Sequence, residues 1–332
     1  MKAMVLEEQK PIKEKPLKLK DVPKPVPREK QVLIRIRACG ICRTDLHIVE
    51  GELPPVKLPL IPGHQVVGVV EETGEHVGSL RRGDRVGVAW LYWTCGSCEF
   101  CRRGLENLCE RALFTGYSVD GGYAEYIAVP EEYAFPLPGG YSDEEVAPLL
   151  CGGVIGYRAF KLAELPKEGV LGLFGFGSAA HIVLQIAKYF GHKVYVFTRS
   201  PERQELARRL GAEWAGHPKE ESPVKLDSAI VFAPAGWVAV EALKNLKKGG
   251  RLVLAEIYMT PIEHLEYRLL YYERSIKTVA NFTRKDAVEL LSVAPKAGVK
   301  TSVEVFKLSE ANEALLKLKT RGLRASGVLK VV

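Results

Sequence analysis

Short apolar runs separated by Gly and Pro dominate the first part of the chain. The segments QVLIRIRAC (31–39), HQVVGVVEET (64–73), GDRVGV (83–88) and GGYAEYIAVP (121–130) are rich in β-branched residues, which is typical of strands. Many short strands joined by Gly turns predict a partly closed, β-rich barrel for about residues 1–150.

From about residue 151, apolar strands alternate with amphipathic helices. The predicted strands are VLGLFGFG (170–177), KVYVFT (193–198), SAIVFAP (228–234), RLVLAEI (251–257) and IKTVAN (276–281), and the predicted helices are SAAHIVLQIAKYFG (178–191), ERQELARRLG (202–211) and WVAVEALKNLKKGG (237–250). Ser200 is a good N-cap and Pro201 fits the first helical position. This alternation predicts an α/β fold with a doubly wound parallel sheet, and the chain then continues with a helix, DAVELLSVA (286–294), and a last strand, GVLKVV (327–332).

Composition adds limits rather than a function. With 332 residues, two domains are expected, and no apolar run is long enough to span a bilayer. The net charge of +7 comes from basic residues scattered among glutamates, which favours a mixed solvated surface over a nucleic-acid interface. The first ten residues do not look secretory, so a cytoplasmic location is expected. Scarce Asn and Gln beside abundant Lys, Arg and Glu resemble the composition of thermostable proteins.

Four of the seven cysteines lie within fifteen residues. CGSCEFCRRGLENLC contains Cys95, Cys98, Cys101 and Cys109. Four thiolates can surround one tetrahedral zinc and leave no open position, so the predicted zinc is structural and folds a loop that lacks its own core. Free cysteines and a nucleic-acid zinc finger are the alternatives, and the finger is disfavoured because no basic recognition helix follows.

A second group is dispersed along the chain. Cys42, His64 and Cys151 each lie next to or near a Gly, in CGIC, PGHQ and LLCGG. Two Cys and one His are a known ligand set for catalytic zinc, with a fourth position for water or substrate. From spacing alone, two core thiols and a satisfied His explain these residues equally well.

The motifs as a set resemble a known family. ACGICRTDLHIVEGE, IPGHQVVGVV, CGSCEFCRRGLENLC, GGYAEYIAVP and APLLCGGVIGY occur in the order found in zinc-dependent alcohol dehydrogenases of the medium-chain dehydrogenase/reductase family. The resemblance covers essentially the whole chain. It implies a GroES-like catalytic domain from residues 1–150 and 281–332, with a zinc lobe at about 92–112, and a Rossmann cofactor-binding domain from residues 151–280.

The resemblance also implies residue roles. Cys42, His64 and Cys151 would hold a catalytic Zn²⁺, and the four-cysteine cluster would hold a structural Zn²⁺. Thr44 would touch the substrate oxygen, and His47 would be the outer end of a proton relay. Asp45 would orient His64, and Arg43 would contact the cofactor pyrophosphate. The implied reaction passes a hydride between an alcohol carbon and the nicotinamide.

One position departs from the family motif. The residue after the histidine ligand is usually Glu, and here it is Gln65. A Glu at this point can approach the zinc and assist ligand exchange, whereas Gln is neutral and binds zinc poorly. Because the three ligands are intact, the catalytic site is retained and the exchange of water for substrate is the step in question.

A glycine-rich turn marks the cofactor site. GLFGFGSAA places Gly175, Phe176, Gly177, Ser178 and Ala180 between a strand and a helix, where glycines permit close approach of a pyrophosphate to the helix N-terminus.

About twenty residues later, the strand ends without a carboxylate. An Asp or Glu that binds the ribose of NAD is usual there, but this chain has Thr198, Arg199 and Ser200, with Arg203 one helical turn on. A cation without a competing carboxylate suits the 2′-phosphate, so NADP(H) is predicted over NAD(H). The alternative is that Arg199 faces solvent and NAD binds through other contacts.

The substrate is expected to be a small hydrophobic alcohol, aldehyde or ketone. The resemblance places Leu53, Trp90, Leu91 and Trp93 at the pocket, with Ile257 and Tyr258 near the nicotinamide, although the two tryptophans could equally belong to the core. Two alternatives remain: an NADPH-dependent ketone or activated-carbonyl reductase with little simple-alcohol activity, and an inactive zinc-bearing nucleic-acid or structural protein. A homodimer or homotetramer without nucleic-acid or membrane partners is expected from the resemblance.

Overall fold

The structure is a computed structural model that describes residues 1–320, 323 and 326–331. Its contacts divide the chain into two compact units. Unit 1 comprises Met1–Cys151, Thr283–Leu291 and Lys300–Val332, and unit 2 comprises Gly152–Phe282 and Ser292–Val299. The sequence-based division assigned 292–299 to the other part of the chain, and its range 281–332 includes 321–322, 324–325 and 332, which lie outside the described residues.

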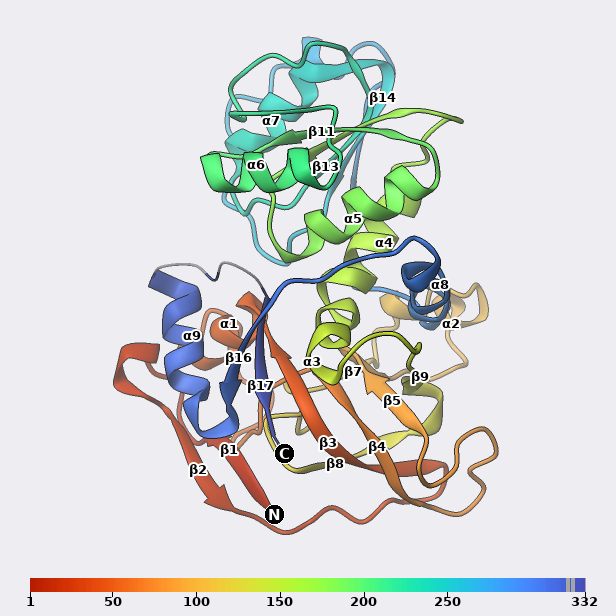
Figure 1. Cartoon of the computed structure of the whole chain (residues 1–332), viewed down its shortest axis with the longest axis vertical. Coiled ribbons are helices and arrows are strands. Elements are labelled where there is room, and N and C mark those ends of the chain that lie inside the picture. Colours follow the sequence, from red (N-terminus) through yellow and green to blue (C-terminus); the bar gives the residue numbers. More distant parts are fainter. Residues whose placement is uncertain (321–322, 324–325, 332) are drawn as a thin grey trace. The chain divides into compact units, whose positions relative to one another are not determined.

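Unit 1 is built on a largely antiparallel seven-stranded sheet. Its strands are β3 (Gln31–Ile41), β4 (Gln65–Thr73), β5 (Arg85–Val88), β8 (Tyr126–Pro130), β9 (Ala134–Pro136), β16 (Val303–Lys307) and β17 (Ser326–Lys330). They run in the order β16-β17-β3-β4-β5-β9, with β8 also paired to β3 (Figure 1). The first half of β3 pairs with β8 and its last residues pair with β17, so this one long strand connects both parts of the sheet.

Two small hairpin-like sheets and several short helices complete unit 1. One sheet pairs β1 (Lys2–Leu6) with β2 (Leu17–Asp21), and the other pairs β6 (Leu91–Trp93) with β7 (Leu113–Phe114). The helices are α1 (Arg43–Glu50), α2 (Glu99–Arg102), α3 (Asp143–Val146) and α9 (Ala311–Thr320). The 3₁₀ turns are η1 (Ile12–Glu14), η2 (Glu106–Leu108), η3 (Glu131–Tyr133), η4 (Ala147–Leu150) and η6 (Leu308–Glu310). Inward side chains of β3 and β4, such as Ile34, Ile36 and Val66, are fully buried and form the core of the unit with α1 and α9 residues.

Unit 2 is a parallel six-stranded sheet flanked by helices. Its strands are β10 (Val170–Phe174), β11 (Lys193–Phe197), β12 (Trp214–Gly216), β13 (Leu226–Val231), β14 (Leu246–Leu254) and β15 (Ser275–Thr278), and its helices are α4 (Gly152–Leu162), α5 (Ser178–Tyr189), α6 (Pro201–Arg209) and α7 (Gly236–Asn245), with the turn η5 (Tyr267–Leu269). The order β12-β11-β10-β13-β14-β15 is the doubly wound Rossmann order, with β10 at its centre. The fold class predicted from the alternation of strands and helices is therefore confirmed.

Helix α8 (Arg284–Lys296) contributes residues to both units. No helix among the described residues is both long and apolar enough to cross a bilayer.

The helix predicted over 237–250 was wrong at its C-terminal end. It ends at Asn245, and Leu246 already begins β14. The Asn245 side chain accepts a hydrogen bond from the Ser222 amide at 2.7 Å and donates one to the Glu241 carbonyl at 2.9 Å. These bonds, with Gly249 at φ 71°, turn the chain into the strand sooner than the apolar period indicates.

Candidate metal centres and cofactor turn

Cys42, His64 and Cys151 meet in unit 1. His64 Nε2 lies 3.4 Å from each of the two Sγ atoms, and the sulfurs are 3.9 Å apart. Together the three ligand atoms form one group close enough to hold a metal ion. The structure therefore brings together the dispersed ligands that spacing alone could not unite.

The pairing of β3 with β4 sets the positions of the first two ligands. The register places Gly40 opposite Gln65, so the end of β3 and the start of β4 lie side by side. Cys42 follows β3 as the N-cap of α1, and its Sγ accepts a hydrogen bond from the Thr44 amide at 3.3 Å. His64 immediately precedes β4, so its ring projects at the same edge of the sheet.

Asp45 supports this group from behind. Its carboxylate accepts a hydrogen bond from the Cys42 amide at 2.8 Å and lies 3.1 Å from His64 Nδ1, and its side chain is fully buried. A carboxylate at Nδ1 fixes the tautomer that leaves Nε2 as the donor to a metal. The residue predicted to orient His64 is thus in position to do so.

The electrostatics of the group favour a cation. Burial lowers the pKa of His64, but the negative charges of Cys42 and Asp45 outweigh it and raise that pKa to about 10. The hydrogen bond from Cys151 leads the effects that hold the pKa of the Cys42 thiol well below its usual value. Two half-buried sulfurs and one buried imidazole, with the Cys42 thiol biased toward thiolate, match the donor chemistry that zinc prefers, and three donors leave one tetrahedral position open.

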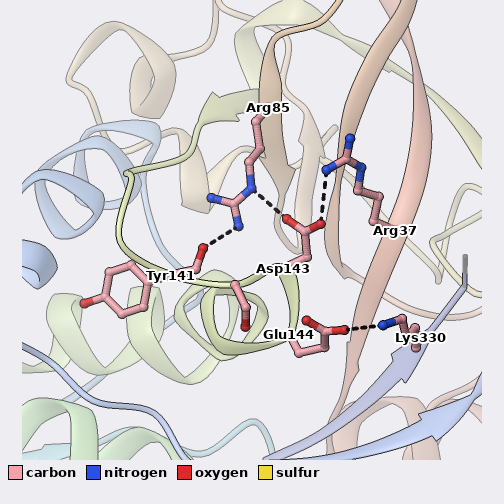
Figure 2. A pocket seen from close by; sticks show the side chains of 7 residues that line it. Arg37, Arg85, Tyr141, Asp143, Glu144 and Lys330 are labelled. Atoms are coloured by element: carbon pink, nitrogen blue, oxygen red, sulfur yellow. Dashed lines mark hydrogen bonds and ion pairs between the residues drawn. The ribbon is translucent and has the colours of Figure 1, made fainter.

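The segment before Cys151 is held in place by ion pairs. Cys151 follows α3 and η4. The carboxylate of Asp143, the first residue of α3, lies 2.7 Å from Arg85 Nε and 3.4 Å from an Arg37 nitrogen (Figure 2). Arg85 also donates to the Tyr141 carbonyl at 3.1 Å.

These side chains line a cavity of about 460 Å³, where Lys330 pairs with Glu144 at 3.3 Å (Figure 2). Its three cations are bound to carboxylates of α3, so the network serves to fix this segment against β3, β5 and β17 rather than to bind a ligand.

The four-cysteine cluster also forms one group. The Sγ atoms of Cys95, Cys98, Cys101 and Cys109 all lie within 4.8 Å of one another. The Cys98 amide donates to Cys95 Sγ at 3.3 Å, and the Cys101 amide donates to Cys98 Sγ at 3.5 Å.

Two thiols of this cluster have pKa values shifted in opposite directions. Hydrogen bonds, first from the Ser97 backbone and then from Arg111, lower the pKa of Cys95 to about 5, whereas burial is the leading cause that raises the pKa of Cys101 to about 11. Backbone amides aimed at sulfur and a set of four thiols fit a closed tetrahedral zinc.

The predicted glycine turn joins β10 to α5 in unit 2. Gly175 has φ 90°, and a Cβ there would lie 3.0 Å from the Phe232 backbone, so a side chain would be both strained and crowded. Gly177 is the N-cap of α5, Ser178 is its first residue, and Phe176 and Ala180 are buried in the core. The amides of the first turn of α5 therefore follow a tight turn, as a dinucleotide site requires.

The segment after β11 has the polarity that the sequence indicated. Thr198 is 5% exposed, and its amide donates to the Gly216 carbonyl at 2.9 Å. Ser200 caps α6 by accepting from the Arg203 amide at 3.3 Å, and its hydroxyl contacts the Glu202 carboxylate at 2.5 Å. The side chains of Arg199 and Arg203 are exposed beside it.

Sequence comparisons identify the family to which these sites belong. The profile described as "Alcohol dehydrogenase GroES-like domain" matches residues 28–139, and "Zinc-binding dehydrogenase" matches residues 180–295. The probable alcohol dehydrogenase AdhA of Mycobacterium tuberculosis is 46% identical over 93% of this chain and 91% of its own. The chain belongs to the zinc-type alcohol dehydrogenases of the medium-chain dehydrogenase/reductase family.

Solved structures agree with this assignment. The CAD protein of Helicobacter pylori, solved with NADP(H), aligns with a TM-score of 0.86 and 25% identity over 99% of this chain and 97% of its own. The acetophenone reductase of Geotrichum candidum, solved with NAD, aligns with a TM-score of 0.87 and 26% identity over the same shares. This alcohol dehydrogenase is thus an oxidoreductase with a GroES-like part and a Rossmann part.

The residues predicted for the proton relay of this alcohol dehydrogenase, Thr44 and His47, and the predicted pyrophosphate contact, Arg43, all lie on α1. Arg43 is its exposed first residue, Thr44 is half-buried, and His47 is 8% exposed. His47 Nδ1 is in short contact with the carboxylate of Glu52, which lies just beyond the end of the helix. Sequence reasoning missed Glu52, because no spacing rule links a histidine to a carboxylate across a turn that ends a helix.

The predicted pocket residues have diverse environments. The Trp90 ring meets the His64 ring edge-on, with centroids 5.1 Å apart, and Leu53 is half-buried beside the same core. Leu91 is fully buried and Trp93 is 37% exposed, so these neighbours on β6 point to different surroundings. Ile257 and Tyr258 are exposed in unit 2, at 54% and 60%.

Gln65 occupies a tight place behind the metal ligands. It is 3% exposed, and a Cβ on Gly40 would lie 2.6 Å from its Oε1, so only glycine leaves it room. Its Nε2 is buried and has no hydrogen-bond partner among the described residues. The tight contact with Gly40 therefore fixes the place of this side chain next to His64.

Proposed function

We propose that this enzyme is a zinc-dependent alcohol dehydrogenase and aldehyde reductase that uses NADP(H) and acts on hydrophobic substrates. The observation that carries the proposal is the combination of the buried Cys42, His64 and Cys151 group with a β11 end that lacks a carboxylate. The first supports a metal-assisted reaction at oxygen, and the second supports a phosphorylated cofactor.

The two metal groups have different proposed roles. Cys42, His64 and Cys151 would hold a catalytic Zn²⁺, because three donors leave a position for the substrate oxygen. Cys95, Cys98, Cys101 and Cys109 would hold a structural Zn²⁺ with no open position. The catalytic ion, when bound, polarises the oxygen of the alcohol or carbonyl.

The remaining steps fall to side chains of α1. The Thr44 hydroxyl, two residues after the first ligand, would accept the proton of the alcohol and pass it outward to His47, which releases it to water. Asp45 holds the His64 ring in one tautomer throughout. The nicotinamide of the bound cofactor would accept the hydride with its electron pair, so the proton and the hydride would leave the alcohol by separate routes.

The cofactor preference is argued from charge. An Asp or Glu in place of Thr198 would repel a 2′-phosphate, whereas Arg199 and Arg203 would attract it, and Ser200 offers a hydroxyl at the helix start. Glu202 now contacts that hydroxyl, so its exposed carboxylate must turn into solvent when the phosphate binds. The Gly175 turn, Phe176, Gly177, Ser178 and Ala180 would receive the pyrophosphate, with Arg43 as a further contact and Ile257 near the nicotinamide.

Titration of the protein with NADPH and with NADH tests this proposal without a substrate. Trp214 in β12 contacts Phe197 of β11 at 5.0 Å between ring centroids, so tryptophan fluorescence is a suitable signal. NADPH should bind about tenfold more tightly, a difference of about 1.4 kcal/mol. Arg199→Ala should remove that advantage and leave NADH binding unchanged, whereas Arg209→Ala, at the far end of α6, should change neither.

Other outcomes would change the account. Equal or tighter NADH binding would contradict the NADP(H) preference and leave the family assignment in place. If neither nucleotide binds, the dehydrogenase proposal fails for this chain. Measurable DNA affinity that falls with salt would then favour the inactive zinc-bearing alternative.

A second function is favoured by one comparison and one residue. The acetophenone reductase of Geotrichum candidum has the same fold, and Gln65 replaces the family glutamate that assists ligand exchange. Reduction of ketones or other activated carbonyls, with little oxidation of simple alcohols, follows if exchange at the metal is slow. A panel of aliphatic alcohols, aldehydes and aryl ketones separates the two proposals by the class with the highest kcat/KM.

We also propose a cytoplasmic homodimer or homotetramer without nucleic-acid or membrane partners. The strand β15 is the last in the order of the unit 2 sheet, and Tyr267 and Tyr271 near it are 74% and 63% exposed. An unpaired strand edge beside exposed aromatics is suited to association with a second copy. Light scattering on the purified protein gives the number of chains directly.

A further inference from the structure

Glu52 is in contact with the proposed relay base but belongs to no motif. The helix α1 ends at Glu50, and Gly51, with φ 82°, reverses the chain so that Glu52 returns alongside the last turn. There the Glu52 carboxylate meets Nδ1 of His47 in a short contact. The His47 side chain is 10% exposed and the Glu52 side chain is 60% exposed, so the pair lies at the boundary between interior and solvent.

The turn that carries Glu52 is held in place. Gln9 Nε2 donates to the Ile48 carbonyl at 2.7 Å and to the Leu53 carbonyl at 3.0 Å, bridging the helix to the residue after Glu52. The Leu53 amide donates to the His47 carbonyl at 3.2 Å. A Cβ on Gly51 would lie 3.3 Å from the Gln9 side chain, so the turn is also closely packed. Glu52 is therefore positioned by backbone bonds rather than by a chance side-chain contact.

A carboxylate at Nδ1 decides what the ring can do. The carboxylate only accepts hydrogen bonds, so it selects the neutral tautomer with the proton on Nδ1. Nε2 is then the basic nitrogen, and the anion also stabilises the imidazolium that forms when Nε2 takes a proton. The same arrangement of carboxylate and imidazole supports base catalysis in hydrolases.

We propose that Glu52 is the positioning residue for His47: its contact with Nδ1 fixes the ring with Nε2 as the proton acceptor. This inference rests on the relay role proposed for His47. Glu52 acts only through His47, so it touches neither substrate nor metal in this account.

The other charged groups near His47 are few among the described residues. Glu50, on the same helix, senses the His47 charge, but its carboxylate accepts from the Ile12 amide at 2.8 Å and pairs with Lys319 of α9 at 2.6 Å. Lys319 therefore offsets the charge of Glu50. Glu52 is the carboxylate in direct contact with the ring, and its substantial exposure limits its effect by solvent screening.

A double-mutant cycle tests the proposal. Glu52→Gln, His47→Gln and the double variant are compared with the unchanged enzyme by kcat/KM for alcohol oxidation across pH, together with zinc content and Tm. Glu29→Gln is the matched control, because Glu29 forms a solvent-exposed pair with His76 at 3.3 Å.

We expect Glu52→Gln to lower the oxidation rate about three- to tenfold, a fraction of the effect typical of a whole general base. The neutral amide can also donate a hydrogen bond to Nδ1, so the ring is no longer held in one tautomer. Zinc content should not change, and in the His47→Gln background Glu52→Gln should have no further effect.

Three results would overturn the inference. An equal rate loss from Glu52→Gln in the His47→Gln background would show that Glu52 acts through the turn and not through the ring. A normal oxidation rate in Glu52→Gln would show that the carboxylate has no role. If His47→Gln itself leaves the oxidation rate unchanged, the proposed relay is wrong, and the inference fails for that separate reason.

Discussion

The two cysteine-rich groups of unit 1 are built in opposite ways. The four-cysteine group lies on one half-buried loop whose cysteines fall within fifteen residues, and it is supported by backbone amides and by the side chains of Ser97 and Arg111. The Cys42, His64 and Cys151 group draws ligands from three distant segments and is enclosed by the sheet core, with Asp45 fully buried behind it. On the proposed assignment of one zinc to each group, the first group would need its metal to define a structure, whereas in the second group the fold would define the place of the metal.

This contrast has consequences for stability and for chemistry. A loop without its own core is folded by its metal–sulfur bonds, so loss of that metal should unfold the loop. A preformed site should keep its shape without metal, so loss of that metal should abolish the reaction and leave the fold in place. Variants that remove one ligand from each group can break the comparison or sharpen it.

The largest expected effect is on activity, from Cys151→Ser. Removal of one of three ligands should cost several kcal/mol of the stabilisation that the metal gives to charge on oxygen, or about a thousandfold in kcat/KM. The melting temperature should change little, because Cys151 is only partly buried and the ion pair of Asp143 with Arg85 still holds the segment before it. A variant with full oxidation activity would refute the assignment of this ligand.

The next effect is on stability, from Cys98→Ser. Loss of a thiolate should release the structural metal and unfold the lobe, with a fall in Tm of about 5–10 °C, since each kcal/mol corresponds to a few degrees in a chain of this size. Thermal unfolding followed by circular dichroism measures it, and Arg103→Ala, an exposed side chain in the same loop, is the control. An unchanged Tm would mean that the lobe folds without metal.

A smaller effect is predicted for Asp45→Asn. The amide keeps the size of the side chain but loses the charge that holds His64 Nδ1–H, so affinity for the catalytic metal should fall about 10- to 100-fold. Competition with a chelator measures this affinity, and the four-cysteine site should release its metal as before. Asp21→Asn, whose carboxylate forms only an exposed pair with Lys2 at 3.2 Å, should behave like the unchanged enzyme.

The smallest effect is expected from Asp143→Asn, which weakens the ion pairs that hold the segment before Cys151. A partly buried charged hydrogen bond to Arg85 is lost, and the unfolding free energy should fall by about 1–2 kcal/mol. Urea unfolding is the measurement. Glu144→Gln breaks only the pair with the exposed Lys330 and should stay within about 0.5 kcal/mol of the unchanged enzyme.

Sequence reasoning reached the local features of the molecule and missed the contacts between distant segments. The four-cysteine spacing and the Gly175 turn are local patterns with a direct physical meaning. The grouping of Cys42, His64 and Cys151 depends on the register of β3 with β4, which spacing does not reveal, so it required family resemblance. The ion pair between Arg85 and Asp143 joins residues 58 positions apart, so no local pattern in the sequence indicates it.

The end of α7 shows another limit. Its apolar period runs on past Asn245, but the side chain of that residue binds Ser222, a partner that the local pattern does not contain. Glu52 was missed for a similar reason, since its meaning comes from the reversal at Gly51 and the bridge made by Gln9. Elements were thus predictable from local pattern, and their terminal contacts were not.

The metal content of the unchanged enzyme and of the two single-ligand variants tests the central claim most directly. Elemental analysis should find two zinc ions per chain in the unchanged enzyme and one in each of Cys151→Ser and Cys98→Ser, with oxidation activity abolished only by the loss at Cys151. A single zinc in the unchanged enzyme, or two in Cys151→Ser, would contradict the account of two separate sites.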